Sequence, residues 1–141
     1  MKKFLIAVLL WVVFPSALLA ASVKNFYGVS AEIPDDWEFR QGEQVIIFNS
    51  SEEADKGGAV IVDCLRSDSV DSAAKKLADA VGVEKEDIGH EDGGALSMEF
   101  EQDGEPVNVR VLGADGCVLM VYTYGKNPAG AAISKSIKPL K

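Results

Sequence analysis

The sequence predicts an α+β fold, namely an α-β-α layered sandwich with a largely antiparallel sheet and the element order βββ-α-βββ-α. Three observations carry this prediction. Two Asp-Gly pairs interrupt an alternating stretch between residues 94 and 125, two segments repeat apolar residues at helical spacing, and short apolar runs fill the first half of the chain. Helices of this kind need a sheet face to cover, and the alternating stretch supplies one.

The N-terminus, residues 1–21, has the pattern of a secretory signal peptide. Lys2 and Lys3 precede an apolar run, Pro15 ends that run, and small residues follow at positions 20 and 21. The run is short for a bilayer span. We therefore predict a periplasmic or secreted protein, a single domain over residues 22–141, and no stable membrane insertion after cleavage.

The first half of the mature chain predicts three strands. Residues 22–33 alternate loosely and are expected to form one strand, which the Pro34-Asp35-Asp36 turn ends. Trp37 is expected to fold back as an apolar plug on the sheet end. Two more strands are predicted over residues 44–49 and 59–66, and the former is apolar on both faces, as is typical of a central strand.

Apolar spacing predicts helices over residues 70–81 and 129–137. Ser69 is a suitable N-cap and Gly82 a suitable C-terminal stop for the first helix. Asn127-Pro128 supplies a cap and a first-turn proline for the second. Residues 83–93, between the first helix and the alternating stretch, form an acidic connector.

The alternating stretch predicts a meander of three strands, with type I′ turns at Asp103-Gly104 and Asp115-Gly116. Two-residue loops fix the pairing register, so the cross-strand neighbours follow by counting from each turn. Three apolar rows then lie on one face: Leu96/Val111/Met120, Met98/Val109/Tyr122 and Phe100/Val107/Tyr124.

The opposite face of the meander is mixed in character. Near the first turn it carries Ser97 and four further polar residues, Glu99, Asn108, Arg110 and Thr123. Such a face either lies partly under the N-terminal strands or receives a partner. These four residues are the predicted partner contacts.

The acidic connector holds the only histidine, His90, together with Asp87, Glu91 and Asp92. Carboxylates and an imidazole can ligate a divalent cation, so these four are candidate metal ligands. The alternative is a solvated loop whose charges keep the protein soluble. EF-hand spacing, a nucleophile motif and a phosphate-binding loop are all missing from the sequence. We therefore predict no catalytic residue, no enzyme activity and no cofactor.

Cys64 and Cys117 are the only cysteines, and both fall in predicted strands. Exported proteins meet an oxidising environment, in which a disulfide closing so long a loop would contribute about 4 kcal/mol. Bridging requires neighbouring strands with Cα atoms roughly 4.4–6.8 Å apart. A possible disulfide and two buried free thiols therefore both stay open.

The chain is acidic, with 14 Lys and Arg against 22 Asp and Glu and a formal net charge of −8. Loss of the leader would remove two of the lysines and make the mature chain more acidic still. Nucleic acids and anionic lipid surfaces require clustered basic residues. The composition therefore excludes a nucleic-acid partner and permits basic partners or cations.

Two segments resemble the PsbP-like superfamily, which includes small bacterial envelope proteins. Residues 29–37 (Val-Ser-Ala-Glu-Ile-Pro-Asp-Asp-Trp) are similar to the strand–Pro–x–x–Trp opening of its domains, and residues 133–138 (Ile-Ser-Lys-Ser-Ile-Lys) to their closing helix. The resemblance covers nearly all of the mature chain. It implies an α-β-α sandwich that binds other proteins without catalysis, and it assigns no functional residues.

These observations favour an exported, non-catalytic protein-binding or stabilising module of the cell envelope, with another envelope protein as its partner. One alternative is an acidic inhibitor of a basic secreted enzyme, which the net charge and the leader support. Another is a carrier of a small ligand or cation that uses the sheet-margin aromatics or the His90 loop.

Overall fold

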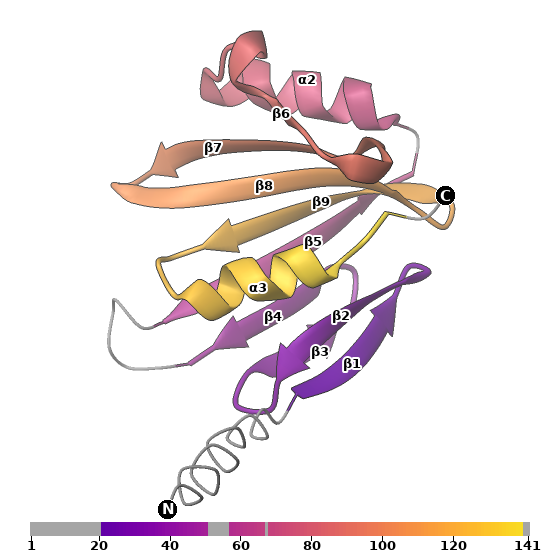
Figure 1. Ribbon diagram of the computed structural model, residues 1–141, viewed down its shortest axis with the longest axis vertical. Helices are drawn as coiled ribbons and strands as arrows, with labels where there is room; N and C mark the ends of the chain where they lie inside the picture. The colour runs from indigo at the N-terminus through magenta and orange to yellow at the C-terminus, as the bar shows by residue number, and fades with distance from the viewer. Residues whose placement is uncertain (1–20, 51–56, 67, 140–141) are drawn as a thin grey trace, which may run out of the picture.

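The computed structural model describes residues 21–50, 57–66 and 68–139, and its fold is α+β with a mostly antiparallel sheet (Figure 1). A seven-stranded sheet has the order β3-β4-β5-β9-β8-β7-β6, and β1 and β2 form a separate hairpin. The predicted leader lies outside the described residues except for Ala21, which begins β1. The strands are β1 Ala21–Phe26, β2 Val29–Pro34, β3 Glu38–Gln41, β4 Val45–Asn49, β5 Gly58–Leu65, β6 Gly89–His90, β7 Leu96–Gln102, β8 Glu105–Ala114 and β9 Cys117–Tyr124.

The prediction of one strand over residues 22–33 is wrong, because the chain reverses at Tyr27-Gly28. Both residues have positive φ, 51° and 83°, as a tight two-residue hairpin turn requires. A tyrosine rarely takes such a φ, so the sequence gives no usual turn signal there and the two strands look like one. Together with the short strand β3, this hairpin gives five strands before the first helix instead of three.

The meander has the predicted register. Leu96 faces Val111, Val111 faces Met120, and the other two apolar rows pair as expected. The first turn has positive φ at both Asp103 and Gly104, as type I′ requires. The second turn is not type I′, since only Gly116 has positive φ. Its Asp115 N–H donates to the Tyr27 carbonyl at 3.0 Å, which docks the β1–β2 turn on the β8–β9 turn.

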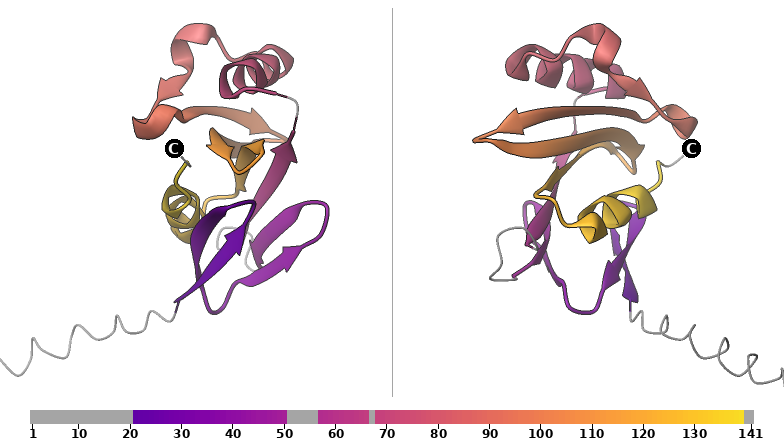
Figure 2. Two further views of the ribbon diagram at one scale, coloured as in Figure 1. Left: turned by 90° about the vertical axis from the view of Figure 1, so that its right-hand side faces the viewer. Right: turned by 60° about the vertical axis from the view of Figure 1, so that its left-hand side comes forward.

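The two helices lie on opposite faces of the sheet. Helix α2 (Val70–Val81) packs on β7 and β8, whereas α3 (Pro128–Ser136) packs on β5 and β9 beside the β1–β2 hairpin (Figures 1 and 2). Both predicted N-caps are confirmed: Ser69 Oγ accepts from the Ser72 N–H at 3.1 Å, and Asn127 Oδ1 accepts from the Ala129 N–H at 2.9 Å. Short 3-10 turns at Lys85–Asp87 and Asp92–Gly94 flank β6.

Each face of the sheet carries its own apolar core, since alternate side chains of a strand point to opposite faces. The predicted apolar rows pack under the alanines of α2. The other core joins β4, β5 and β9 to the β1–β2 hairpin and α3, and Trp37 lies within it as predicted, only 6% exposed. Among the described residues, no helix combines the length and the apolarity needed to cross a bilayer.

Replacing Gly125 should destabilise the fold, because this residue follows β9 with φ +89° and an added Cβ would lie 3.0 Å from the Gly57 carbonyl oxygen. We expect Gly125→Ala to lower the free energy of unfolding by about 1–3 kcal/mol. Gly42→Ala is the matched control, since nothing lies within 4 Å of its added Cβ and its φ is not left-handed. Urea denaturation measures both variants, and equal stabilities would contradict this account.

Candidate functional site

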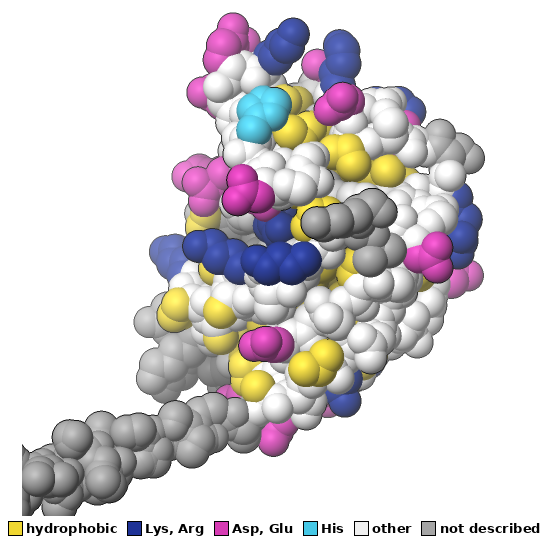
Figure 3. Space-filling view, turned by 45° about the vertical axis from the view of Figure 1, so that its right-hand side comes forward, with side chains coloured by type: hydrophobic (Ala, Val, Ile, Leu, Met, Phe, Trp, Pro, Cys, Tyr) yellow, Lys and Arg dark blue, Asp and Glu magenta, His cyan; other side chains and the backbone are white. Residues whose placement is uncertain are grey.

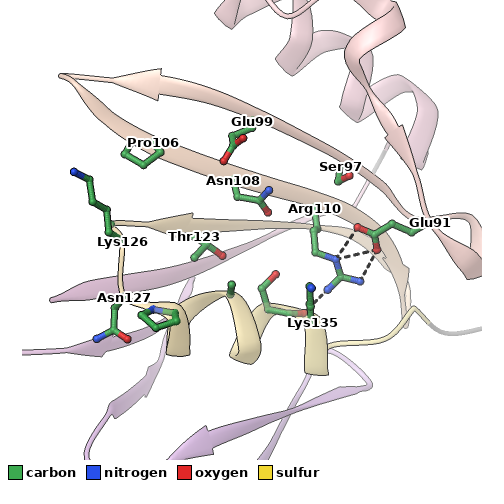
Figure 4. A pocket seen from close by; sticks show the side chains of 14 residues that line it. Glu91, Ser97, Glu99, Pro106, Asn108, Arg110, Thr123, Lys126, Asn127 and Lys135 are labelled. Atoms are coloured by element: carbon green, nitrogen blue, oxygen red, sulfur yellow. Dashed lines mark hydrogen bonds and ion pairs between the residues drawn. The ribbon is translucent and has the colours of Figure 1, made fainter. Parts of the chain in front are cut away.

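A polar cleft lies between α3 and the β7–β8–β9 end of the sheet (Figure 4). It exists because α3 covers β5 and β9 and leaves the same face of β7 and β8 open. Its volume is about 410 Å³. All four predicted partner contacts line this cleft. The lining residues are Glu91, Ser97, Glu99, Pro106, Asn108, Arg110, Thr123, Gly125, Lys126, Asn127, Pro128, Ala131, Ser134 and Lys135.

Three of the predicted contacts form one row across the sheet. Glu99 on β7 faces Asn108 on β8, and Asn108 faces Thr123 on β9. Glu99 is exposed, Asn108 is half-buried and Thr123 is buried, so the row descends from solvent towards α3. A carboxylate, an amide and a hydroxyl thus succeed one another along the cleft floor.

Arg110, the fourth predicted contact, closes one end of the cleft and is 6% exposed. Its Nε donates to both carboxylate oxygens of Glu91, at 3.1 and 3.3 Å, and its Nη2 lies 3.0 Å from Glu91 Oε1. Its Nη1 donates to the Ile137 carbonyl at 2.8 Å and to the Ser134 carbonyl. Both carbonyls lie at the C-terminal end of α3, where backbone acceptors lack the partners of a further helical turn, and the Ser134 carbonyl also accepts the Ile137 N–H at 3.0 Å. The guanidinium therefore ties α3 to the sheet, and its charge is neutralised there.

Two buried hydroxyls of the cleft lining have no hydrogen-bond partner among the described residues. They are Thr123 Oγ1 and Ser134 Oγ, on side chains of residues 7% and 2% exposed. Close packing produces this burial, since an added Cβ at Gly130 of α3 would lie 3.1 Å from Thr123 Cγ2. An unpaired buried hydroxyl costs free energy, so this part of the cleft has hydrogen-bonding capacity that the protein leaves unused.

Charges of both signs remain available in the cleft once Arg110 and Glu91 are paired. Lys126 precedes α3 and Lys135 lies in its last turn, whereas Glu99 stands across the cleft on β7 (Figure 4). None of these three side chains forms an ion pair with another described residue. Figure 3 shows a band of basic side chains on one face of the molecule, below a group of acidic side chains and the histidine.

The four candidate metal ligands are not brought together. His90 lines a second cavity of about 340 Å³ beneath α2, beside Ala78 and Leu96, whereas Glu91 turns to Arg110. Asp87 and Asp92 belong to separate 3-10 turns. Over the described residues, no group of three or more His, Cys, Asp or Glu side chains is placed to hold a metal ion.

Cys64 and Cys117 lie side by side on β5 and β9 as free thiols. Cys64 faces Leu119, so Cys117 is its diagonal neighbour on the same sheet face, and the two thiols are hydrogen-bonded. Burial, reinforced by that hydrogen bond, raises the pKa of the Cys117 thiol to about 12. The thiol therefore stays protonated at neutral pH, and a protonated thiol is a poor nucleophile.

The sequence analysis did not predict the cleft residues at and before α3, of which Lys126, Ser134 and Lys135 matter most for function. All three flank or belong to α3, whose position over the sheet no local pattern specifies. The Asn127-Pro128 pair marks the start of this helix and is the nearest sequence signal to them.

Removing the Arg110 guanidinium should loosen α3, because the Glu91 carboxylate and the Ile137 carbonyl would lose the donor that joins them to β8. We expect Arg110→Gln to lower the free energy of unfolding by about 2–3 kcal/mol. Arg40→Gln removes the exposed ion pair with Glu38, whose side chains are 67% and 55% exposed, and is the control. It should cost under about 1 kcal/mol. Equal losses in urea denaturation would show that Arg110 has no anchoring role.

Native Cys117 should resist alkylation. At pH 8 a pKa of about 12 leaves roughly one thiol in ten thousand ionised. In the reduced protein we expect iodoacetamide to modify Cys117 orders of magnitude more slowly than glutathione. Cys64→Ala should speed the reaction modestly, because it removes the hydrogen bond but not the burial. Mass spectrometry follows the modification of Cys117. Alkylation of this residue as fast as that of free glutathione would contradict the raised pKa.

The sequence matches no protein-family model and no curated protein. The resemblance to PsbP-like domains stays a prediction, and the polar cleft is the feature of the described residues that bears on function.

Proposed function

We propose that this chain is an exported, non-catalytic protein-binding module of the cell envelope, and that the polar cleft is its binding surface. The observation that carries the proposal is the convergence on one cleft of a cross-strand polar row and unpaired α3 side chains. The placement of one helix on each sheet face supports the α-β-α layering of the PsbP-like assignment. Fold likeness alone would be weak support for a function, so the proposal depends on the residues of the cleft.

The chemistry of the described residues supports a binding role over a catalytic one. The only histidine lies away from the polar cleft, in the cavity beneath α2. The Cys117 thiol is protonated, and Arg110 is held by structural contacts. Among the described residues of the cleft lining, no hydroxyl is hydrogen-bonded to a carboxylate or an imidazole, which is the contact that activates a nucleophile for covalent catalysis.

The form of the cleft supports a polypeptide partner. It is an open groove bounded by a helix and a sheet, and its lining mixes amide, hydroxyl and charged groups. Polar rims of this kind are typical of non-obligate protein interfaces, which use about one hydrogen bond per 100–200 Å². The Asn108 amide both donates and accepts, so it suits a partner backbone.

A photo-crosslinker placed in the cleft tests this proposal. Ala131 lines the cleft on α3, whereas its neighbour Ala132 is exposed and does not. We expect a p-benzoylphenylalanine replacing Ala131 to crosslink one envelope protein in the native host, and the same group replacing Ala132 to crosslink none. Mass spectrometry identifies the product.

Affinity for the identified protein provides the second measurement. Ala131→Trp fills the cleft from an exposed position and should weaken binding at least about tenfold, whereas Ala132→Trp should leave it unchanged. Equal crosslinking from both positions, or none from Ala131, would contradict the proposal. Unchanged affinity of Ala131→Trp would do the same.

A further inference from the structure

We infer that the cleft recognises a polypeptide segment carrying both an acidic and a basic side chain. The acidic group meets Lys126 or Lys135 on the α3 side, and the basic group meets Glu99 on the β7 side. This inference rests on the proposed function and specifies the chemistry of its partner.

Arg110 and Glu91 are paired with each other, so neither charge is available to a ligand. The Arg110 guanidinium donates hydrogen bonds to Glu91 and to the carbonyls at the end of α3, and its side chain is only 8% exposed. This pair is therefore a fixed end wall.

The remaining charged side chains lie on two opposite walls of the cleft. Both lysines come from the α3 side, one before the helix and one in its last turn, and Glu99 comes from the opposite wall (Figure 4). Asn108 stands beside Glu99 on the floor and offers both a donor and an acceptor. An occupant that lies across the cleft thus meets positive charge on one wall and negative charge on the other.

A ligand whose charges all have the same sign fits the cleft poorly. A purely acidic segment would be attracted by the two lysines but repelled by Glu99, and a purely basic one would be attracted by Glu99 but repelled by both lysines. Like-charge juxtaposition opposes binding and is a common source of specificity. The hydroxyls of Thr123 and Ser134, both at least nine-tenths buried, have no hydrogen-bond partner among the described residues. They therefore favour an occupant that can form hydrogen bonds.

Blocked peptides containing one Lys and one Asp separated by none to about four glycines test the inference, since each added residue lengthens the separation of the two charges by up to roughly 3.3 Å. NMR titration follows the side-chain NH₂ of Asn108. We expect at least one of these peptides to bind about fivefold more tightly than the matched peptides in which Gln replaces Lys or Asn replaces Asp. The small zwitterion γ-aminobutyrate separates a polypeptide ligand from a free metabolite.

Charge-removing variants assign each wall. Glu99→Gln should abolish the advantage of Lys over Gln in the peptide, and the double variant Lys126→Gln/Lys135→Gln should abolish that of Asp over Asn. Glu101→Gln and Lys138→Gln, which lie outside the cleft lining, should change neither. Peptide binding that Ala131→Trp blocks but that shows no charge preference would overturn the inference and leave the proposed function standing. So would γ-aminobutyrate binding as tightly as the best peptide, or no peptide shifting Asn108. Failure of the crosslinking experiment would instead overturn the proposed function.

Discussion

The two-residue turn at Asp103-Gly104 is the constraint on which the arrangement of this protein depends. It fixes the pairing register of β7 with β8, and therefore which side chains of the two strands share a sheet face. Because β8 also pairs with β9, the same side chains of β9 lie on that face. A slip of one residue would exchange the two faces of these strands. With the observed register, the valines of β8 lie under α2, and the row from Glu99 to Thr123 lies on the side of α3.

The second constraint is the bond between Arg110 and the end of α3. The helix is nine residues long, and its buried apolar side chains within the helix are few, so packing alone gives it a modest hold on the sheet. The guanidinium adds hydrogen bonds to the carbonyls of Ser134 and Ile137, and Glu91 balances its charge. One buried side chain on β8 thus joins the helix, the connector before β7 and the sheet, and it fixes the width of the cleft at that end.

Incomplete cover explains why this face of the sheet both stabilises the fold and offers a surface. Helix α3 and the β1–β2 hairpin bury the apolar half of the face, at β4, β5 and part of β9. The polar half, at β7 and β8, has no element over it among the described residues. Glu99 on β7 faces Lys126 and Lys135 from the α3 side, and none of the three is ion-paired with another described residue, which supports recognition of a ligand with charges of both signs.

The sequence by itself determined the local and pairwise features: the meander register, the helix over residues 70–81 with its caps, the burial of Trp37, and the polar row. Each follows from short-range chemistry, either turn geometry, side-chain alternation or capping. Tertiary structure alone decided the turn at Tyr27-Gly28, which a contact with Asp115 supports, and the burial of Arg110. It also decided the addition of Lys135 to the cleft. These features depend on where α3 and the hairpin pack, and that is set by long-range contacts between segments far apart in the chain.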